Sequence, residues 1–174
     1  MNALDRDSIS PLMLAVHFGD LNVVKMLIRH GANVNQCDRM NTSILHHACM
    51  RLHTDIVKEL ISAGCTRNSY TPYSYCSSLK YLVTGECYMT AKCLIESGCD
   101  LSDEKWIFDD AFASKKKLDP EFIKWIRNYV KTPPKLINLC RKNIRASIGS
   151  QNLADKVKTL CIPKYLEEYL LMKF

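Results

Sequence analysis

Histidines and cysteines are the side chains best suited to chemistry in this chain of 174 residues, which holds five and nine of them. His46, Cys49 and His53 follow one another at helical spacing and could together face a zinc ion. Protein zinc sites gather three or four such ligands, and no fourth ligand accompanies this set. A Cys–His nucleophile is disfavoured because no third group stands ready to orient the pair. We therefore expect no metal site here.

Other chemical groups give no better case for an enzyme. Asp109-Asp110 and Glu167-Glu168 are better explained as solvated faces than as acid–base pairs, and the chain has no Gly-rich phosphate loop. We expect no catalytic residue and no cofactor. The cysteines are odd in number and form no Cys-x-x-Cys pair, and the N-terminus has no secretory signal pattern. Reduced thiols in the cytoplasm, or also in the nucleus, are therefore expected. No apolar run approaches the ~18–20 residues that span a bilayer.

An internal repeat organises most of the chain. At an offset of 33 residues, the run from Ser10 to Ala15 aligns with the run from Ser43 to Ala48, and Gly31 aligns with Gly64. A looser third copy follows at an offset of 34 and places Gly98 on Gly64. Each copy predicts a serine-capped helix, a turn, a second helix with an apolar face, and a glycine that ends it.

Helix, turn, helix and loop at this period are similar to the ankyrin repeat, and Ser-Ile-Leu-His-His-Ala resembles its T-P-L-H-x-A signature. The resemblance implies an all-α ankyrin-repeat solenoid, in which helix pairs alternate with projecting hairpin loops. Residues 1–130 are assigned to the solenoid, with units at about 5–37, 38–70 and 71–104 and a degenerate capping unit at 105–130. In the capping unit we expect one short helix around Trp106–Phe112 and a second that opens at Pro120.

The beginning of the chain falls inside this pattern. Asn2–Asp5 aligns with Asn35–Asp38, in the loop that would follow an earlier repeat. This register indicates a shortened form of a longer array, without its N-terminal repeats.

A second module follows Thr132-Pro133-Pro134. Residues 131–174 carry nine Lys/Arg and three Asp/Glu and hold the whole net charge of +6, whereas residues 1–130 carry fifteen of each. Leu136, Cys140, Ile144 and Ile148 recur every four residues and predict an amphipathic helix. Two further short helices are expected at about 152–160 and after Pro163. Such small helices build little core, so the module should pack on the preceding repeat and leave apolar surface for a partner.

Two short motifs in this module resemble motifs of a known domain. The pattern Leu136-x-x-x-Cys140-x-x-x-Ile144 resembles the elongin-binding BC box of a SOCS box. Residues 160–163, Leu-Cys-Ile-Pro, are similar to the cullin box, with Cys161 where that pattern has its first proline. Together with the repeats, the resemblance covers essentially the whole chain and points to the ankyrin repeat and SOCS box proteins. The SOCS box is assigned to 131–174, with the BC box at 136–144 and the cullin box at 160–163.

The resemblance implies a non-catalytic substrate receptor of a ubiquitin ligase, which would direct ubiquitination and proteasomal degradation of a target. The implied partners are the elongin B–elongin C heterodimer, the type-five cullin with its RING partner, and a protein substrate that the sequence does not name. Contacts with the elongins are expected from Leu136, Leu139, Cys140 and Ile144. Contacts with the cullin are expected from Leu160, Ile162 and Pro163.

Substrate contacts are expected on the loop tips and the inner helix face, where ankyrin arrays usually meet their partners. The positions singled out by alignment are Phe18, Arg39, Met40, Met50, Arg51 and Tyr73. Several of these side chains are apolar where solvent is expected, which favours a protein-binding surface.

Two alternatives use the same residues differently. The chain could be a plain ankyrin interaction scaffold, or a truncated competitor that binds elongins without productive ligase assembly. Nucleic-acid binding by the basic C-terminal helix is disfavoured, because no aromatic residues are interleaved with its charges for base stacking.

Overall fold

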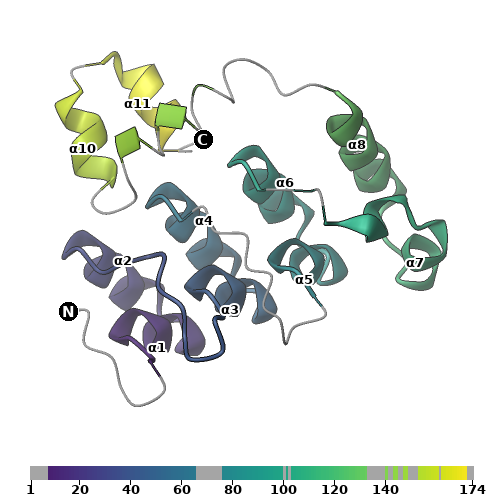
Figure 1. The fold of residues 1–174 in the computed structure, drawn as a ribbon, viewed down its shortest axis with the longest axis horizontal. Helices are drawn as coiled ribbons and strands as arrows, with labels where there is room; N and C mark the ends of the chain where they lie inside the picture. Colours follow the sequence, from purple (N-terminus) through teal and green to yellow (C-terminus); the bar gives the residue numbers. More distant parts are fainter. Residues whose placement is uncertain are drawn as a thin grey trace.

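The computed structural model describes residues 8–65, 76–99, 101, 103–132, 140, 143–144, 147–148, 153–160 and 162–171. All the regular elements in these ranges are helices, and an isolated bridge between Cys37 and Ser43 is the one extended pairing among them. The predicted all-α fold is confirmed, and Figure 1 shows the helices standing side by side in successive pairs.

Three regular units form the body of the stack. Their helix pairs are α1 (Pro11–Phe18) with α2 (Leu21–Arg29), α3 (Ile44–Met50) with α4 (Thr54–Ser62), and α5 (Ser78–Thr84) with α6 (Tyr88–Glu96). First helices pack on first helices and second helices on second helices, which gives two layers (Figure 1). The first-helix layer, α1, α3 and α5, is the inner face on which the sequence predicts substrate contacts.

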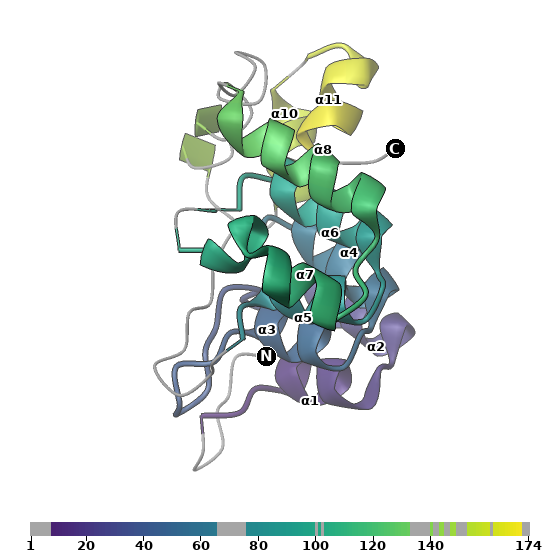
Figure 2. The ribbon, with the colours of Figure 1, turned by 90° about the vertical axis from the view of Figure 1, so that its right-hand side faces the viewer.

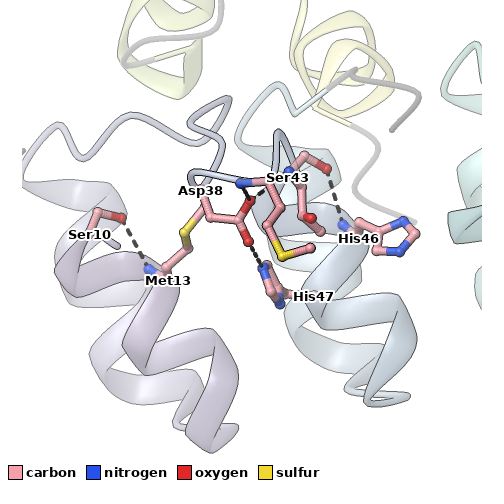
Figure 3. A network of polar contacts seen from close by, with 8 residues as sticks. Ser10, Met13, Asp38, Ser43, His46 and His47 are labelled. Atoms are coloured by element: carbon pink, nitrogen blue, oxygen red, sulfur yellow. Dashed lines mark hydrogen bonds and ion pairs between the residues drawn. The ribbon is translucent and has the colours of Figure 1, made fainter. Parts of the chain in front are cut away.

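The predicted serine caps hold the start of each first helix. Ser10 Oγ accepts a hydrogen bond from the backbone amide of Met13 at 3.2 Å. Ser43 Oγ accepts one from the backbone amide of His46 at 3.2 Å (Figure 3). In the third unit, Ser77 Oγ accepts the amide of Lys80 at 3.1 Å. Each bond satisfies one of the amides that a helix leaves free at its N-terminus.

The turn between the two helices of each unit requires a left-handed backbone. Gly19 supplies it in the first unit with φ of 79°. Leu52, Glu86 and Lys117 occupy the same place in the later units with φ of 57°, 60° and 50°. An L-residue with a side chain pays roughly 1–2 kcal/mol for this conformation, so the packing of the helix pair imposes it against local preference.

A single buried cluster runs through all the units. It extends from Leu12 and Val16 in α1, through Leu45 in α3 and Leu82 in α5, to Ile126 at the far end. Because each unit contributes side chains to its neighbour, the described residues of the units share one core.

The fourth unit differs from its prediction at one point. The single helix expected around Trp106–Phe112 was wrong: a 3-10 helix, η1 (Lys105–Phe108), is followed by α7 (Asp110–Lys115). Asp109 separates them in an extended conformation, and its Oδ1 accepts the Phe112 amide at 3.1 Å as the cap of α7. Helix α8 (Pro120–Lys131) opens at the proline, as predicted.

The C-terminal module is described only in part. Residues 140, 143–144 and 147–148 are helical, and α10 (Leu153–Thr159) and α11 (Lys164–Leu170) follow. Its buried cluster consists of Leu153, Val157, Leu170 and Leu171, with Ile148 and Ile162 packed against it. Among the described residues this cluster contains no side chain of the stack, and the expected packing of the module on the preceding repeat stays a prediction.

Candidate partner-binding surfaces

The hairpin loop that leads into α3 is organised by one carboxylate. Asp38 Oδ1 accepts the amides of Met40 at 2.9 Å and Thr42 at 2.7 Å, which closes the loop on itself. Asp38 Oδ2 lies 3.0 Å from Nε2 of His47, and Figure 3 shows the carboxylate turned toward that ring. Asp38 therefore ties the loop tip to the inner helix, and positions Arg39 and Met40 relative to α3.

The side chains predicted to meet a substrate lie at the surface. Phe18 is 79% exposed, Met40 55% and Met50 42%, and Arg39 and Arg51 are exposed as well. Tyr73, the remaining member of the predicted set, lies outside the described residues. Large apolar side chains thus stand in solvent on α1, α3 and the intervening hairpin.

Arg51 and His17 link the inner helices of the first two units. Arg51 Nη2 lies 2.9 Å from His17 Nε2. A guanidinium can only donate, so the ring nitrogen accepts and His17 is neutral in this arrangement. Desolvation lowers the pKa of His17, and the positive charges of Arg51, His47 and His53 lower it further. The ring of Phe18 meets His17 edge-on at 5.5 Å between centroids, so cation and aromatic side chains form one continuous surface.

The histidines and the cysteine first considered as metal ligands pack against protein groups in the structure. His46 is buried, and its Nδ1 lies 3.4 Å from Ser78 Oγ in the next unit. Cys49 is fully buried, and desolvation raises the pKa of its thiol. The ring of His53 covers Gly19, where an added Cβ would lie 2.8 Å from its Cε1. Within the described part of the chain, no three His, Cys, Asp or Glu side chains gather as a metal site.

The SOCS-box residues predicted to bind elongins are seen in part. Cys140 is exposed and Ile144 is 39% exposed, whereas Ile148, one turn further on, packs against the internal cluster of the module. Leu136 and Leu139 lie outside the described residues. The helix therefore uses its last apolar position internally and presents the two before it to solvent.

The residues predicted to contact the cullin also include both exposed and partly buried side chains. Leu160 is 43% exposed and Pro163 is exposed, while Ile162 is half-buried against the internal cluster. Cys161 lies outside the described residues.

Sequence reasoning missed two contributors to the inner face. Leu14 is 46% exposed on α1, one turn before Phe18. His47 occupies the variable position x of the T-P-L-H-x-A signature, and its ring contacts Asp38. The alignment of Leu14 with His47 at the 33-residue offset was the signal that both positions face the same way.

Comparison with known proteins identifies both modules. Residues 12–105 match the family model of ankyrin repeats in three copies, and residues 132–171 match that of the SOCS box. The helix pair α7–α8 lies between the two matches. An array of ankyrin units followed by a SOCS box defines the class of this chain. It belongs to the ankyrin repeat and SOCS box proteins.

Two similar curated proteins match different lengths of this chain, and the longer match is to a protein of the same family. The ankyrin repeat and SOCS box protein 11 of Danio rerio is 32% identical over 169 residues, which cover 93% of this chain and 53% of that protein. Protein phosphatase 1 regulatory subunit 27 of Mus musculus is 33% identical over 69 residues, or 40% of this chain and 45% of its own length. The chain spans about half the length of these relatives. No described helix is both long and apolar enough to cross a membrane.

Proposed function

We propose that this chain is the substrate-recognition adaptor of a ubiquitin ligase built on elongin B, elongin C and the type-five cullin with its RING partner. It would act in the cytoplasm or nucleus and direct a target protein to ubiquitination and proteasomal degradation. Both modules are interaction modules, and the adaptor would act by proximity, holding a target lysine near the conjugating enzyme.

The observation that carries the proposal is the exposed apolar stripe at the start of the SOCS box. Cys140 and Ile144 stand in solvent on the helix whose Ile148 completes the internal cluster. Burying an isoleucine side chain contributes roughly 1.5–3 kcal/mol. Ile144 is 39% exposed, so a partner groove that takes up this side chain would gain the corresponding part of that free energy.

The cullin contact is proposed for Leu160 and Pro163, which are exposed beside the start of α11. Ile162 between them packs inward and would hold the two neighbours in place rather than contact the cullin itself. This division refines the prediction that all three residues bind the cullin.

The substrate contact is proposed for the inner face of the first two units. Phe18, Met40 and Met50 present apolar surface there, and Arg39 and Arg51 add positive charge. Aromatic, Met and Arg side chains are enriched at the centres of protein interfaces. The hairpin bonds of Asp38 order this surface before a partner arrives, which reduces the entropy lost on binding.

Co-purification with elongin B and elongin C tests the proposal. The chain should form a stable ternary complex that is lost in Ile144→Asp and in the double variant Leu136→Ala with Cys140→Phe. Asn138→Asp is the matched control, because the helical spacing of the sequence places Asn138 opposite the apolar stripe and the substitution adds the same charge. It should bind like the parent chain.

Adding the N-terminal domain of the cullin then separates the alternatives. A quaternary complex that weakens in Leu160→Asp supports a complete adaptor. Elongin binding without cullin binding would instead favour the truncated competitor. A folded chain that ignores the elongins would leave a plain ankyrin scaffold as the better description.

A further inference from the structure

The end of the stack beyond α6 carries a groove that the adaptor function does not use. It has a volume of about 590 Å³ and is lined by α7, the following turn and α8. Ala113, Leu118 and Ile123 contribute apolar surface to it. Figure 2 looks at this end of the molecule, with α7 and α8 in front of the other described helices.

Positive charge dominates the rim of this groove. Four of its lining residues are cationic, Lys117, Lys124, Arg127 and Lys131, against the single carboxylate of Asp110, which leaves a balance of +3. Arg127 is already engaged: its Nη2 lies 2.7 Å from Asp110 Oδ1 and its Nε donates to the carbonyl of Ile107 at 2.7 Å.

The three lysines are differently placed. Lys117, Lys124 and Lys131 are exposed, and none of them forms an ion pair with another described residue. Lys124 and Lys131 are seven residues apart on α8, about two helical turns or 10 Å along its axis. Three cations of like sign along one groove repel one another, and an anionic chain laid between them would relieve that repulsion.

We infer that this groove binds an acidic, partly apolar segment of a partner protein. The lysines would pair with carboxylates, and the apolar surface of Ala113, with the small exposed parts of Leu118 and Ile123, would take side chains between them. Helix α8 is about 18 Å long, so about six residues of an extended peptide would follow it. Nucleic acid fits the groove less well, because none of its lining residues is aromatic and could stack on a base. Peptide binding in this groove does not depend on elongin binding, and it is expected even if the chain does not bind the elongins.

Fluorescence anisotropy with the full chain tests this inference. The probe is a labelled synthetic peptide of alternating Glu and Leu, and its comparison is the same peptide with Gln in place of Glu. The Glu peptide should bind more tightly than the Gln peptide, and added salt should weaken its binding because the rim charges are exposed. Each lost surface pair costs about two- to fivefold. The triple variant Lys117→Glu, Lys124→Glu and Lys131→Glu should therefore weaken binding by about eightfold or more.

A second triple variant controls for net charge. Lys105→Glu, Lys115→Glu and Lys116→Glu removes the same charge from exposed residues of the same unit outside the groove lining. Parent-like binding by this control supports the groove. Equal losses in both variants would show general charge attraction and overturn the inference. So would equal binding of the Glu and Gln peptides, or tighter binding of a single-stranded RNA that the groove variant loses.

Discussion

The ankyrin stack and the SOCS box bury their apolar side chains in different ways. The stack holds one continuous cluster that passes through four helix pairs, and Val16, Leu60, Leu82 and Ile126 are all fully buried. The described part of the SOCS box buries Leu153, Val157, Leu170 and Leu171, and leaves Ile144 and Leu160 about two-fifths exposed.

This difference separates stability from recognition. A side chain buried at the centre of the stack loses many contacts when truncated, whereas an exposed apolar side chain of the box has few contacts to lose. We therefore expect stack variants to change the free energy of unfolding, and variants of the exposed box positions to change partner binding.

The largest effect is expected from truncation in the middle of the stack. Leu45 is 1% exposed between the first and third units, so Leu45→Ala should lower the free energy of unfolding by about 2–5 kcal/mol. Urea denaturation followed by circular dichroism measures the change. Leu160→Ala in the box is the matched comparison and should stay within about 0.5 kcal/mol. Similar losses in the two variants would contradict the separation.

A smaller effect is expected at the turn of the first unit. Gly19→Ala forces a side chain into a backbone with φ of 79° and places its Cβ 2.8 Å from the ring of His53. The backbone term alone should cost about 1–2 kcal/mol, and displacement of His53 should add to it. Thermal unfolding of the variant checks the loss. Glu86→Gly makes the opposite change at an equivalent turn and should not destabilise. A stable Gly19→Ala chain would show that the turn adapts.

The turns also show where sequence reasoning reaches its limit. The offsets of 33 and 34 residues predicted the helix pairs of the first three units, because serine caps, apolar faces and closing glycines are local signals. Nothing about Leu52 or Lys117 as residue types predicts a left-handed backbone, which the packing of each helix pair imposes. Asp109 likewise ended a predicted helix early, by capping the next one.

For the candidate sites, sequence located the positions but not their surroundings. Alignment with the repeat placed Phe18, Met40 and Met50 on the surface, and their exposure bears this out. The bond between Asp38 and His47 joins residues nine apart across a hairpin, so it needed the folded loop. The lysines of the α7–α8 groove come from the irregular fourth unit, where no repeat register guided the reading.

Loss of the Asp38 carboxylate should loosen the hairpin of the second unit without affecting the rest of the stack. Asp38→Ala removes the acceptor for the amides of Met40 and Thr42 and should raise their hydrogen-exchange rates, at a cost of about 1–2 kcal/mol. Asp38→Asn is the control, because its side-chain oxygen can still accept from both amides. Unchanged exchange in Asp38→Ala would show that the loop is ordered by other contacts.

The smallest effect is expected from His17. Its pKa is lowered in the folded chain from the ordinary value of 6.5, so the unfolded chain binds the proton more readily. The stability contributed by neutral His17 is present above pH 6.5 and is lost as the pH falls toward the lower folded pKa. His17→Asn should flatten this part of the profile, as urea midpoints between pH 5 and 7 would show. An identical profile for both chains would exclude His17 as its source.

Hydrogen exchange of the full chain, with and without elongin B and elongin C, is the decisive measurement for the adaptor role. The adaptor role predicts that the elongins protect amides around residues 140–148, and that exchange in α1–α6 stays unchanged. Ile144→Asp should abolish that protection, whereas Asn138→Asp should retain it. Protection of the inner helices in place of the SOCS box, or no protection anywhere, would contradict the proposal that the box is the docking module of a ubiquitin ligase adaptor.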